Sequence, residues 1–174
     1  MTDLAELLRR LGLRLPADAL AALLAHATKT KLSPAQLVES LCEAEVRERE
    51  ARNLARRGKI AAVGSPKPLD RFDWNHPRSV DRDLYEQLYE SLDFVRSGEN
   101  VLLRGQAGVG KTTLAQHLAL RALERGMTVR FSTLPAALAD LLRQESLPAT
   151  ERRLRRYVTP DLLVLDELGY VPCD

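Results

Sequence analysis

The stretch that most constrains the fold of this chain runs from Asn100 to Leu114 and reads Asn-Val-Leu-Leu-Arg-Gly-Gln-Ala-Gly-Val-Gly-Lys-Thr-Thr-Leu. It matches the G-x-x-x-x-G-K-[ST] pattern of a phosphate-binding P-loop through Gly105, Gly110, Lys111 and Thr112. The apolar residues before the loop are typical of a buried strand, and a helical pattern begins after it. The sequence therefore predicts a strand over 101–104, then the loop, then a helix over 112–125.

The residue types of this loop suit the binding of a nucleoside triphosphate. Glycines let the backbone curl so that successive N–H groups converge on phosphate oxygens, and the start of a helix directs its positive dipole end toward the same anion. Lys111 adds a mobile charge for the β- and γ-phosphates of ATP, and the hydroxyl of Thr112 is placed to ligate Mg²⁺. A glycine-rich turn that binds nothing is the alternative, and the adjacent lysine and threonine argue against it.

A second apolar run, Asp161-Leu-Leu-Val-Leu-Asp166-Glu167, predicts a buried strand over 161–166 with two carboxylates at its C-terminal end. Ligands gather at that end of the strands in open parallel sheets. The run has the form of a Walker B element, in which Asp166 holds Mg²⁺ and Glu167 polarises the attacking water. Acids after an apolar run are also common at strand-end turns, but the position behind a P-loop favours the functional interpretation.

The composition is that of a soluble globular protein. Of the 174 residues, 45% are hydrophobic and 29% are charged, and no stretch reads as a signal peptide or a membrane span. The net charge of +2 is too small to indicate nucleic-acid binding without local clustering. Cys42 and Cys173 lie far apart, which predicts reduced thiols in the cytoplasm rather than a disulfide or a zinc site. Structural or solvated roles are expected for His26, His76 and His117.

Residues 1–58 are expected to form a helical N-terminal domain. One helix starts near Asp3 and ends at Gly12, a second covers 16–28, and a third starts with the capping signal Ser33-Pro34-x-Gln36 and ends at Gly58. The third helix carries glutamate–arginine pairs at i,i+4 spacing, which are Glu43–Arg47, Glu45–Arg49 and Glu48–Arg52. A solvated helix is the simpler interpretation. The alternative is an arm that contacts DNA phosphates through Arg47, Arg49, Arg52, Arg56, Arg57 and Lys59.

Residues 59–79 are expected to be a linker, because Gly64-Ser65-Pro66-Lys67-Pro68 cannot continue a regular element. Phe72 and Trp74 are its large apolar residues, and we expect them to hold the linker on the next domain, near a nucleotide base. The core follows over 80–174. It comprises a helix from Ser79 to Gly98, the P-loop region, a strand over 128–132, helices over 134–143 and 149–157, and the strand over 161–166. Such alternation predicts an α/β fold with a parallel, doubly wound sheet and helices on both faces.

A cluster of arginines lies in the helix expected over 149–157, at Arg152, Arg153, Arg155 and Arg156. A charged, solvated helix face is the default interpretation of such a cluster. Because few acids lie nearby, the alternative is a patch that contacts phosphates or a neighbouring subunit.

With both nucleotide-binding elements placed, the chain resembles the IstB-like ATP-binding proteins. These are the transposition helper ATPases of insertion sequences, and they are related to DnaC-type helicase loaders and to DnaA. The resemblance covers nearly the whole chain and is carried by Asn100-Val-Leu-Leu, Gly-x-x-Gly-Val-Gly-Lys-Thr, Val129-Arg-Phe and Pro160-Asp-Leu-Leu-Val-Leu-Asp-Glu-Leu-Gly-Tyr-Val-Pro. Two departures are Gln106-Ala107, where the family commonly has two prolines, and Thr113, where it often has histidine. The first removes no required N–H donor, and the second has no evident chemical consequence.

The resemblance implies an AAA+ ATPase with a P-loop core that binds ATP and Mg²⁺. It implies assembly of several copies on double-stranded DNA, without sequence preference, and cooperation with a transposase in the cytoplasm. The implied nucleotide contacts run along the loop, at Gly105, Gln106, Ala107, Gly108, Val109, Gly110, Lys111, Thr112 and Thr113. Mg²⁺ is assigned to Thr112 and Asp166, and hydrolysis to Glu167 and Lys111.

In this fold family the strand after Walker B lies between the P-loop strand and the Walker B strand, and a polar residue on it helps to position the attacking water. Because the sequence ends at Asp174, we expect a core that is incomplete at its C-terminus, with unpaired strand edges, weak nucleotide affinity and little ATPase activity. Two functions stay open. One is an ATP-hydrolysing transposition helper, with a helicase loader as its near alternative. The other is a truncated, non-catalytic module that binds DNA or a partner through its N-terminal helices.

Overall fold

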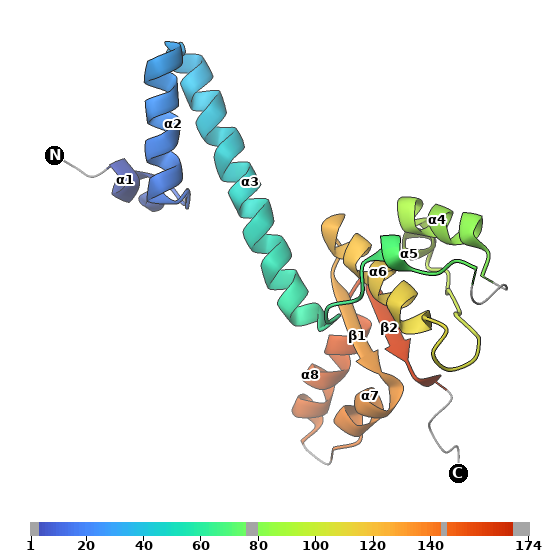
Figure 1. Ribbon diagram of the computed structural model, residues 1–174. Coiled ribbons are helices and arrows are strands. Elements are labelled where there is room, and N and C mark those ends of the chain that lie inside the picture. Colours follow the sequence, from blue (N-terminus) through green and yellow to red (C-terminus); the bar gives the residue numbers. More distant parts are fainter. Residues whose placement is uncertain (1–3, 76–79, 144–145, 169–174) are drawn as a thin grey trace. The chain divides into compact units, whose positions relative to one another are not determined.

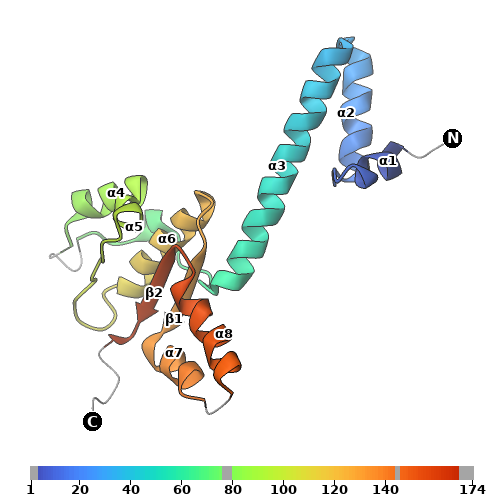
Figure 2. The same cartoon turned by 180° about the vertical axis from the view of Figure 1, so that it is seen from behind.

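The computed structural model describes residues 4–75, 80–143 and 146–168, and its elements are labelled in Figure 1 and seen from behind in Figure 2. The chain divides into two compact units, Met1–Ala55 and Arg56–Asp174. The first unit contains α1 (Leu4–Arg10), α2 (Ala17–Thr30) and most of α3 (Pro34–Ala61). The second unit contains the end of α3 and then η1 (Leu69–Arg71), α4 (Arg82–Ser91), α5 (Asp93–Ser97), α6 (Lys111–Glu124), β1 (Val129–Thr133), α7 (Leu134–Leu141), α8 (Leu147–Val158) and β2 (Leu162–Asp166). Within the described ranges no helix is long and apolar enough to cross a membrane.

The start of α3 is the predicted one, and its end is not. The backbone N–H of Ser33 donates to Gln36 Oε1 over 2.9 Å and that of Gln36 donates to Ser33 Oγ over 3.3 Å, which makes a reciprocal capping box. The expected end at Gly58 is wrong, because the helix continues to Ala61 and the chain turns at Ala62, whose φ is +57°. A glycine inside a helix costs only about 1 kcal/mol, and Ala61 is fully buried in the core of the second unit.

Glu45, expected on a solvated helix face, is a buried residue of the first unit and only 3% exposed. Its carboxylate accepts the backbone N–H of Arg14 at 2.7 Å and the guanidinium of Arg52 at 3.0 Å, with Arg49 3.4 Å away. Arg49 and Arg52 also donate to backbone carbonyls of the turn between α1 and α2. The pair of Glu45 and Arg49 is therefore a contact that fixes this turn. The other two expected pairs are present at 3.6 and 3.9 Å.

The second unit is built on a parallel pair of strands, in register from Val129 opposite Leu162 to Thr133 opposite Asp166. The predicted α/β class with parallel strands is confirmed. Helix α6 packs against both strands, and α7 packs against β1. Thr128 and Asp161 fasten the strands at their starts, because the N–H and the hydroxyl of Thr128 each donate to Asp161 Oδ2 over 2.7 Å. These two hydrogen bonds lower the pKa of Asp161 below its ordinary value.

The prediction of a strand over 101–104 is wrong, because this segment is not part of a sheet. Its side chains nevertheless alternate between the core and the solvent, as those of a strand do. Val101 and Leu103 pack against the core, whereas Leu102 is 73% exposed. A strand also needs a hydrogen-bonded neighbour, and in the part of the chain that the structure describes the sheet has two strands, β1 and β2. The apolar pattern therefore predicts the inward face of this segment but not its pairing.

The single helix expected from Ser79 to Gly98 is two helices, α4 and α5. Ser79 lies outside the described residues, and the N-cap of α4 is Asp81, whose side chain accepts the N–H of Leu84 at 2.9 Å. The break falls at Leu92, which has φ +52° and is 1% exposed. Burial of this large apolar side chain outweighs the strain of its left-handed backbone.

Helix α6 contributes the largest share of the buried residues in this unit's described core, with Leu114, Leu118, Ala119, Ala122 and Leu123. The segment after α3 is fastened along α6, because Gln116 Nε2 donates to the carbonyl of Val63 over 2.7 Å and His117 Nε2 lies 2.7 Å from that of Lys67. The expected linker is thus held on the core. As predicted, Phe72 and Trp74 pack against the core.

Candidate functional site

The P-loop sequence forms an irregular loop over 105–110 that leads directly into α6, whose N-cap is Gly110. Gly108 and Gly110 have φ angles of +80° and +88°, in the left-handed region that glycine enters without strain. Gly105 is not in that region, and a Cβ on it would lie 3.4 Å from Val109 Cγ2, which is an ordinary contact. The leading N–H groups of a helix have no intrahelical acceptor. Together with the positive end of the helix dipole, those of α6 suit an anion.

The charge of the loop comes from Lys111, the first residue of α6. Its ammonium donates to the carbonyl of Gly105 over 2.8 Å and to that of Gln106 over 2.6 Å. The side chain therefore folds back over the loop, and its positive charge is held beside the same backbone that the helix start leaves rich in N–H donors.

Thr112 and Asp166 bring the two motifs together. The hydroxyl of Thr112 donates to Asp166 Oδ2 over 2.7 Å, although the residues are 54 positions apart in the sequence. Asp166 is the last residue of β2, so its carboxylate lies at the C-terminal end of a parallel strand, where α/β sheets bind ligands. The loop at the start of α6 and the acidic end of β2 thus form one site.

Glu167 follows immediately and has a constrained backbone. Its φ is +60°, which is uncommon for a residue with a side chain, and its N–H donates to Asp166 Oδ1 over 2.9 Å. The side chain of Glu167 is exposed. The side chain of Glu167 therefore lies at the surface, directly after the carboxylate that contacts Thr112.

The donor set fits a magnesium ion that is shared with phosphate. Mg²⁺ in proteins is commonly held by one or two carboxylates together with phosphate oxygens and water. Thr112 and Asp166 supply one hydroxyl and one carboxylate. The described residues contain no group of three or more His, Cys, Asp or Glu side chains that could hold a metal ion by themselves.

Phe72 is a residue of this site whose position the sequence did not define. A Cβ placed on Gly110 would lie 2.4 Å from Phe72 Cε2 and 3.1 Å from its Cζ, so the ring lies against the backbone of Gly110. The sequence signal was a large aromatic residue in a polar linker. That signal indicates docking, but not the residue on which the ring docks.

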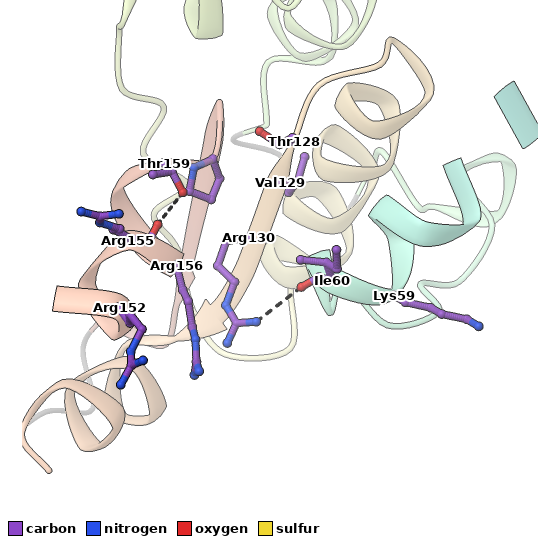
Figure 3. A pocket seen from close by; sticks show the side chains of 10 residues that line it. Lys59, Ile60, Thr128, Val129, Arg130, Arg152, Arg155, Arg156 and Thr159 are labelled. Carbon is purple, nitrogen blue, oxygen red and sulfur yellow. Dashed lines mark hydrogen bonds between the residues drawn. The ribbon is translucent and has the colours of Figure 1, made fainter. Parts of the chain in front are cut away.

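A second surface of the same unit, which we call the basic hollow, lies at the start of β1 (Figure 3). Its volume is about 780 Å³, and it is lined by Lys59, Ile60, Thr128, Val129, Arg130, Arg152, Arg155, Arg156, Thr159 and Pro160. These residues come from the end of α3, the start of β1 and the second half of α8 with the turn that follows it. The lining contains five cationic side chains and no carboxylate.

Most of the charge in the basic hollow is uncompensated. Within the described residues, Lys59, Arg130, Arg152 and Arg155 have no carboxylate within 4.0 Å, and Arg156 shares Asp140 at 3.7 Å. Arg130 lies over the ring of Tyr157 at 5.5 Å, and its Nε is buried without a hydrogen-bond partner in the described chain. Uncompensated guanidinium groups around a hollow suit phosphate groups, which they can bind in a bidentate manner.

The arginine cluster expected from the sequence is only partly the one that lines the hollow. Arg153 is 8% exposed and lies 3.6 Å from the carboxylate of Asp140, so it joins α8 to α7 and does not belong to a surface patch. Arg130 of β1, which lies outside that sequence cluster, lines the hollow instead. A lone arginine in a strand gives no clustering signal, and the fold alone brings it beside α8.

Comparisons with a family model and with individual proteins agree on one family. A family model described as IstB-like ATP binding protein matches residues 6–174. A protein of insertion sequence IS5376 in Geobacillus stearothermophilus, named for ATP binding, is 32% identical over 169 residues, which cover 97% of this chain and 67% of the relative. A protein of insertion sequence IS21 in Pseudomonas aeruginosa, also named for ATP binding, is 33% identical over 172 residues. These residues cover 99% of this chain and 64% of the relative. This chain spans about two thirds of the length of these relatives.

Proposed function

Because the chain belongs to the family of IstB-like ATP binding proteins, we propose that it binds ATP with Mg²⁺ as a helper protein of DNA transposition. The observation that carries the proposal is the 2.7 Å contact between Thr112 and Asp166. A P-loop sequence can occur in a turn without function. Its placement against a strand-end carboxylate from a distant segment is the arrangement that a magnesium–triphosphate site requires.

Each residue has a role that its position supports. The N–H groups at the start of α6 face the anion, and Lys111 neutralises phosphate charge. Thr112 and Asp166 hold the metal ion, and Glu167 orients water for attack. Bound ATP supplies the phosphoanhydride bond whose hydrolysis gives ADP and phosphate. Hydrolysis by this chain is part of the proposal, as are the transposase as partner and assembly of several copies on DNA.

The test is ATP binding by the full chain in the presence of Mg²⁺, measured by titration calorimetry. Lys111→Ala is expected to weaken binding about tenfold or more, since hydrogen bonds to charged groups contribute roughly 1.5–3 kcal/mol. Lys59→Ala, which removes the same charge at the basic hollow, is the matched control and should leave ATP affinity unchanged. Equal affinities of the wild-type chain and Lys111→Ala would disprove the assignment. Glu167→Gln should retain binding and abolish any turnover.

A second proposal, which the basic hollow favours, is binding of double-stranded DNA through its phosphates without sequence preference. Phosphate contacts made by arginine and lysine supply most of non-specific affinity. The helper and the non-catalytic binding module differ in how DNA binding depends on ATP. If Lys111→Ala abolishes DNA binding, the chain acts as an ATP-dependent helper or a helicase loader. If DNA binding is unchanged, the chain is a binding module.

A further inference from the structure

The ring of Phe72 occupies the space where every residue other than glycine would carry its Cβ at position 110. Three ring atoms lie between 2.4 and 3.5 Å from that point, and the closest, Cε2, is nearer than real Cβ contacts come. Gly110 is at the same time the N-cap of α6, with φ +88°. The linker thus contacts the P-loop at the residue that begins the anion-facing helix.

Phe72 is held there by its own neighbours. Its ring packs edge-on against Trp74, with centroids 4.8 Å apart, and Trp74 lies 5.4 Å from Tyr85. The hydroxyl of Tyr85 donates to the carbonyl of Leu114 in α6 over 3.0 Å, and this tyrosine is buried. A continuous row of aromatic side chains therefore runs from the P-loop back to the first turns of α6.

The rest of the linker is fastened further along the same helix. Gln116 binds the carbonyl of Val63 and His117 that of Lys67, each over 2.7 Å. Because carbonyl oxygens only accept, His117 Nε2 must be the protonated nitrogen here. These two hydrogen bonds hold the linker beside α6, whereas the ring of Phe72 reaches the loop itself at Gly110.

We infer that Phe72 is a positioning residue for the P-loop, so that docking of the linker and binding of a nucleotide stabilise each other. This inference rests on the proposed nucleotide site. With the ring in place, the backbone at Gly110 is confined to the conformation that starts α6 at Lys111. Without the ring, the loop has more conformations to lose when phosphate binds, and affinity falls. Coupling of two binding events is reciprocal, so nucleotide must also hold the linker on α6 more firmly.

The first arm of the test needs no nucleotide. Hydrogen exchange of the backbone amides over 106–112 is compared in the full-length wild-type chain, Phe72→Ala, Phe72→Leu and Val63→Ala. Val63 is a buried residue of the same linker, whereas the three atoms nearest to a Cβ on Gly110 all belong to Phe72, so Val63→Ala controls for a general loss of packing. Faster loop exchange in Phe72→Ala, partly restored in Phe72→Leu and absent in Val63→Ala, is the expected result. Unchanged exchange in Phe72→Ala would overturn the inference.

The second arm measures ATP affinity with Mg²⁺ for the same four proteins, together with their melting temperatures. Phe72→Ala is expected to bind about fivefold or more weakly, a typical coupling, and Val63→Ala to bind as the wild type does even where its melting temperature is lower. If both variants lose affinity in proportion to stability, Phe72 merely fills the core and the inference fails. If the wild-type chain binds no ATP, the proposed function fails, and the exchange arm still decides the role of Phe72.

Discussion

The P-loop site and the basic hollow belong to the same unit but are made of different parts. The P-loop site consists of the backbone of one continuous stretch, with Lys111 and Thr112 at its end and one distant carboxylate, Asp166. The basic hollow is lined by residues from three separate segments, and five of its side chains are cationic. Substitutions should therefore act on the first site through conformation and on the second through charge.

We expect the largest loss of stability from substitutions at the three glycines of the P-loop. In Gly110→Ala the alanine must adopt a left-handed backbone conformation, which destabilises the fold by roughly 1–2 kcal/mol. Its Cβ also collides with the ring of Phe72, which destabilises the fold by roughly 1–3 kcal/mol more. Gly108→Ala has the same left-handed strain but open space around it, and Gly105→Ala has neither. Urea unfolding of the nucleotide-free chain should rank the losses in this order, with Gly105→Ala close to the wild type. A loss in Gly105→Ala equal to that in Gly110→Ala would contradict this conformational account.

The next largest effect is expected at Asp166, in the Mg²⁺ dependence of ATP affinity. Asp166→Asn keeps an acceptor for the hydroxyl of Thr112 but removes the negative charge that a magnesium ion needs. The free energy of unfolding should change little, while Mg²⁺ should no longer increase ATP affinity. We expect about a tenfold loss in the presence of Mg²⁺ and none in EDTA. Calorimetric titrations in the two buffers give the comparison, and an equal loss in both would assign Asp166 a structural role instead.

The two parts of the P-loop site could each be predicted from the sequence because each is a short, local pattern. The order of glycines, lysine and threonine predicts a loop that leads into a helix, and the apolar run that ends at Asp166 predicts a carboxylate at a strand end. The sequence could not predict which segments pair as strands. The segment over 101–104 has the alternation of a strand, yet strand pairing depends on a neighbour elsewhere in the chain. The sequence likewise indicates that Phe72 docks on the core, but its contact with Gly110 depends on the path of the linker over α6.

The basic hollow was only half predictable, for a physical reason. Clustering along a helix identifies arginines that are near in sequence, but it does not show which side of the helix is buried. Arg153 points inward to Asp140, and Arg130 joins the hollow from a strand. In the first unit Glu45 shows the same limitation, since its i,i+4 spacing suggested a solvated pair and its burial follows from the fold of the α1–α2 turn.

A smaller effect is expected from charge removal at the basic hollow. Arg152 and Arg155 are exposed and have no carboxylate partner within the described residues, so Arg152→Ala/Arg155→Ala should leave the melting temperature unchanged. If both contact DNA phosphates, the slope of log affinity against log salt should become shallower by about 1.8, or 0.9 for each contact. The control is Arg96→Ala/Arg125→Ala, which removes two charges of the same unit outside the hollow, where each arginine has a carboxylate neighbour in Asp93 or Glu90. Equal slopes in the two double variants would remove the hollow from DNA binding, and ATP affinity should be unaffected in both.

The smallest effect on the free energy of unfolding is expected from the contact between Thr128 and Asp161, which joins the strands of both sites. It fastens β1, which carries Arg130, to β2, which ends at Asp166. Because hydrogen bonds lower the pKa of Asp161 in the folded chain, its carboxylate stabilises the fold at pH above its unfolded value of about 3.9, and this contribution is lost as the pH falls through the folded value. Asp161→Asn should therefore reduce the free energy of unfolding by about 1 kcal/mol at neutral pH, and the difference from the wild type should shrink on acidification below about pH 4. Urea titrations of both proteins across this range measure the difference directly. A gap that stays constant with pH would mean that the carboxylate charge plays no part in joining the strand that carries Arg130 to the strand that carries Asp166.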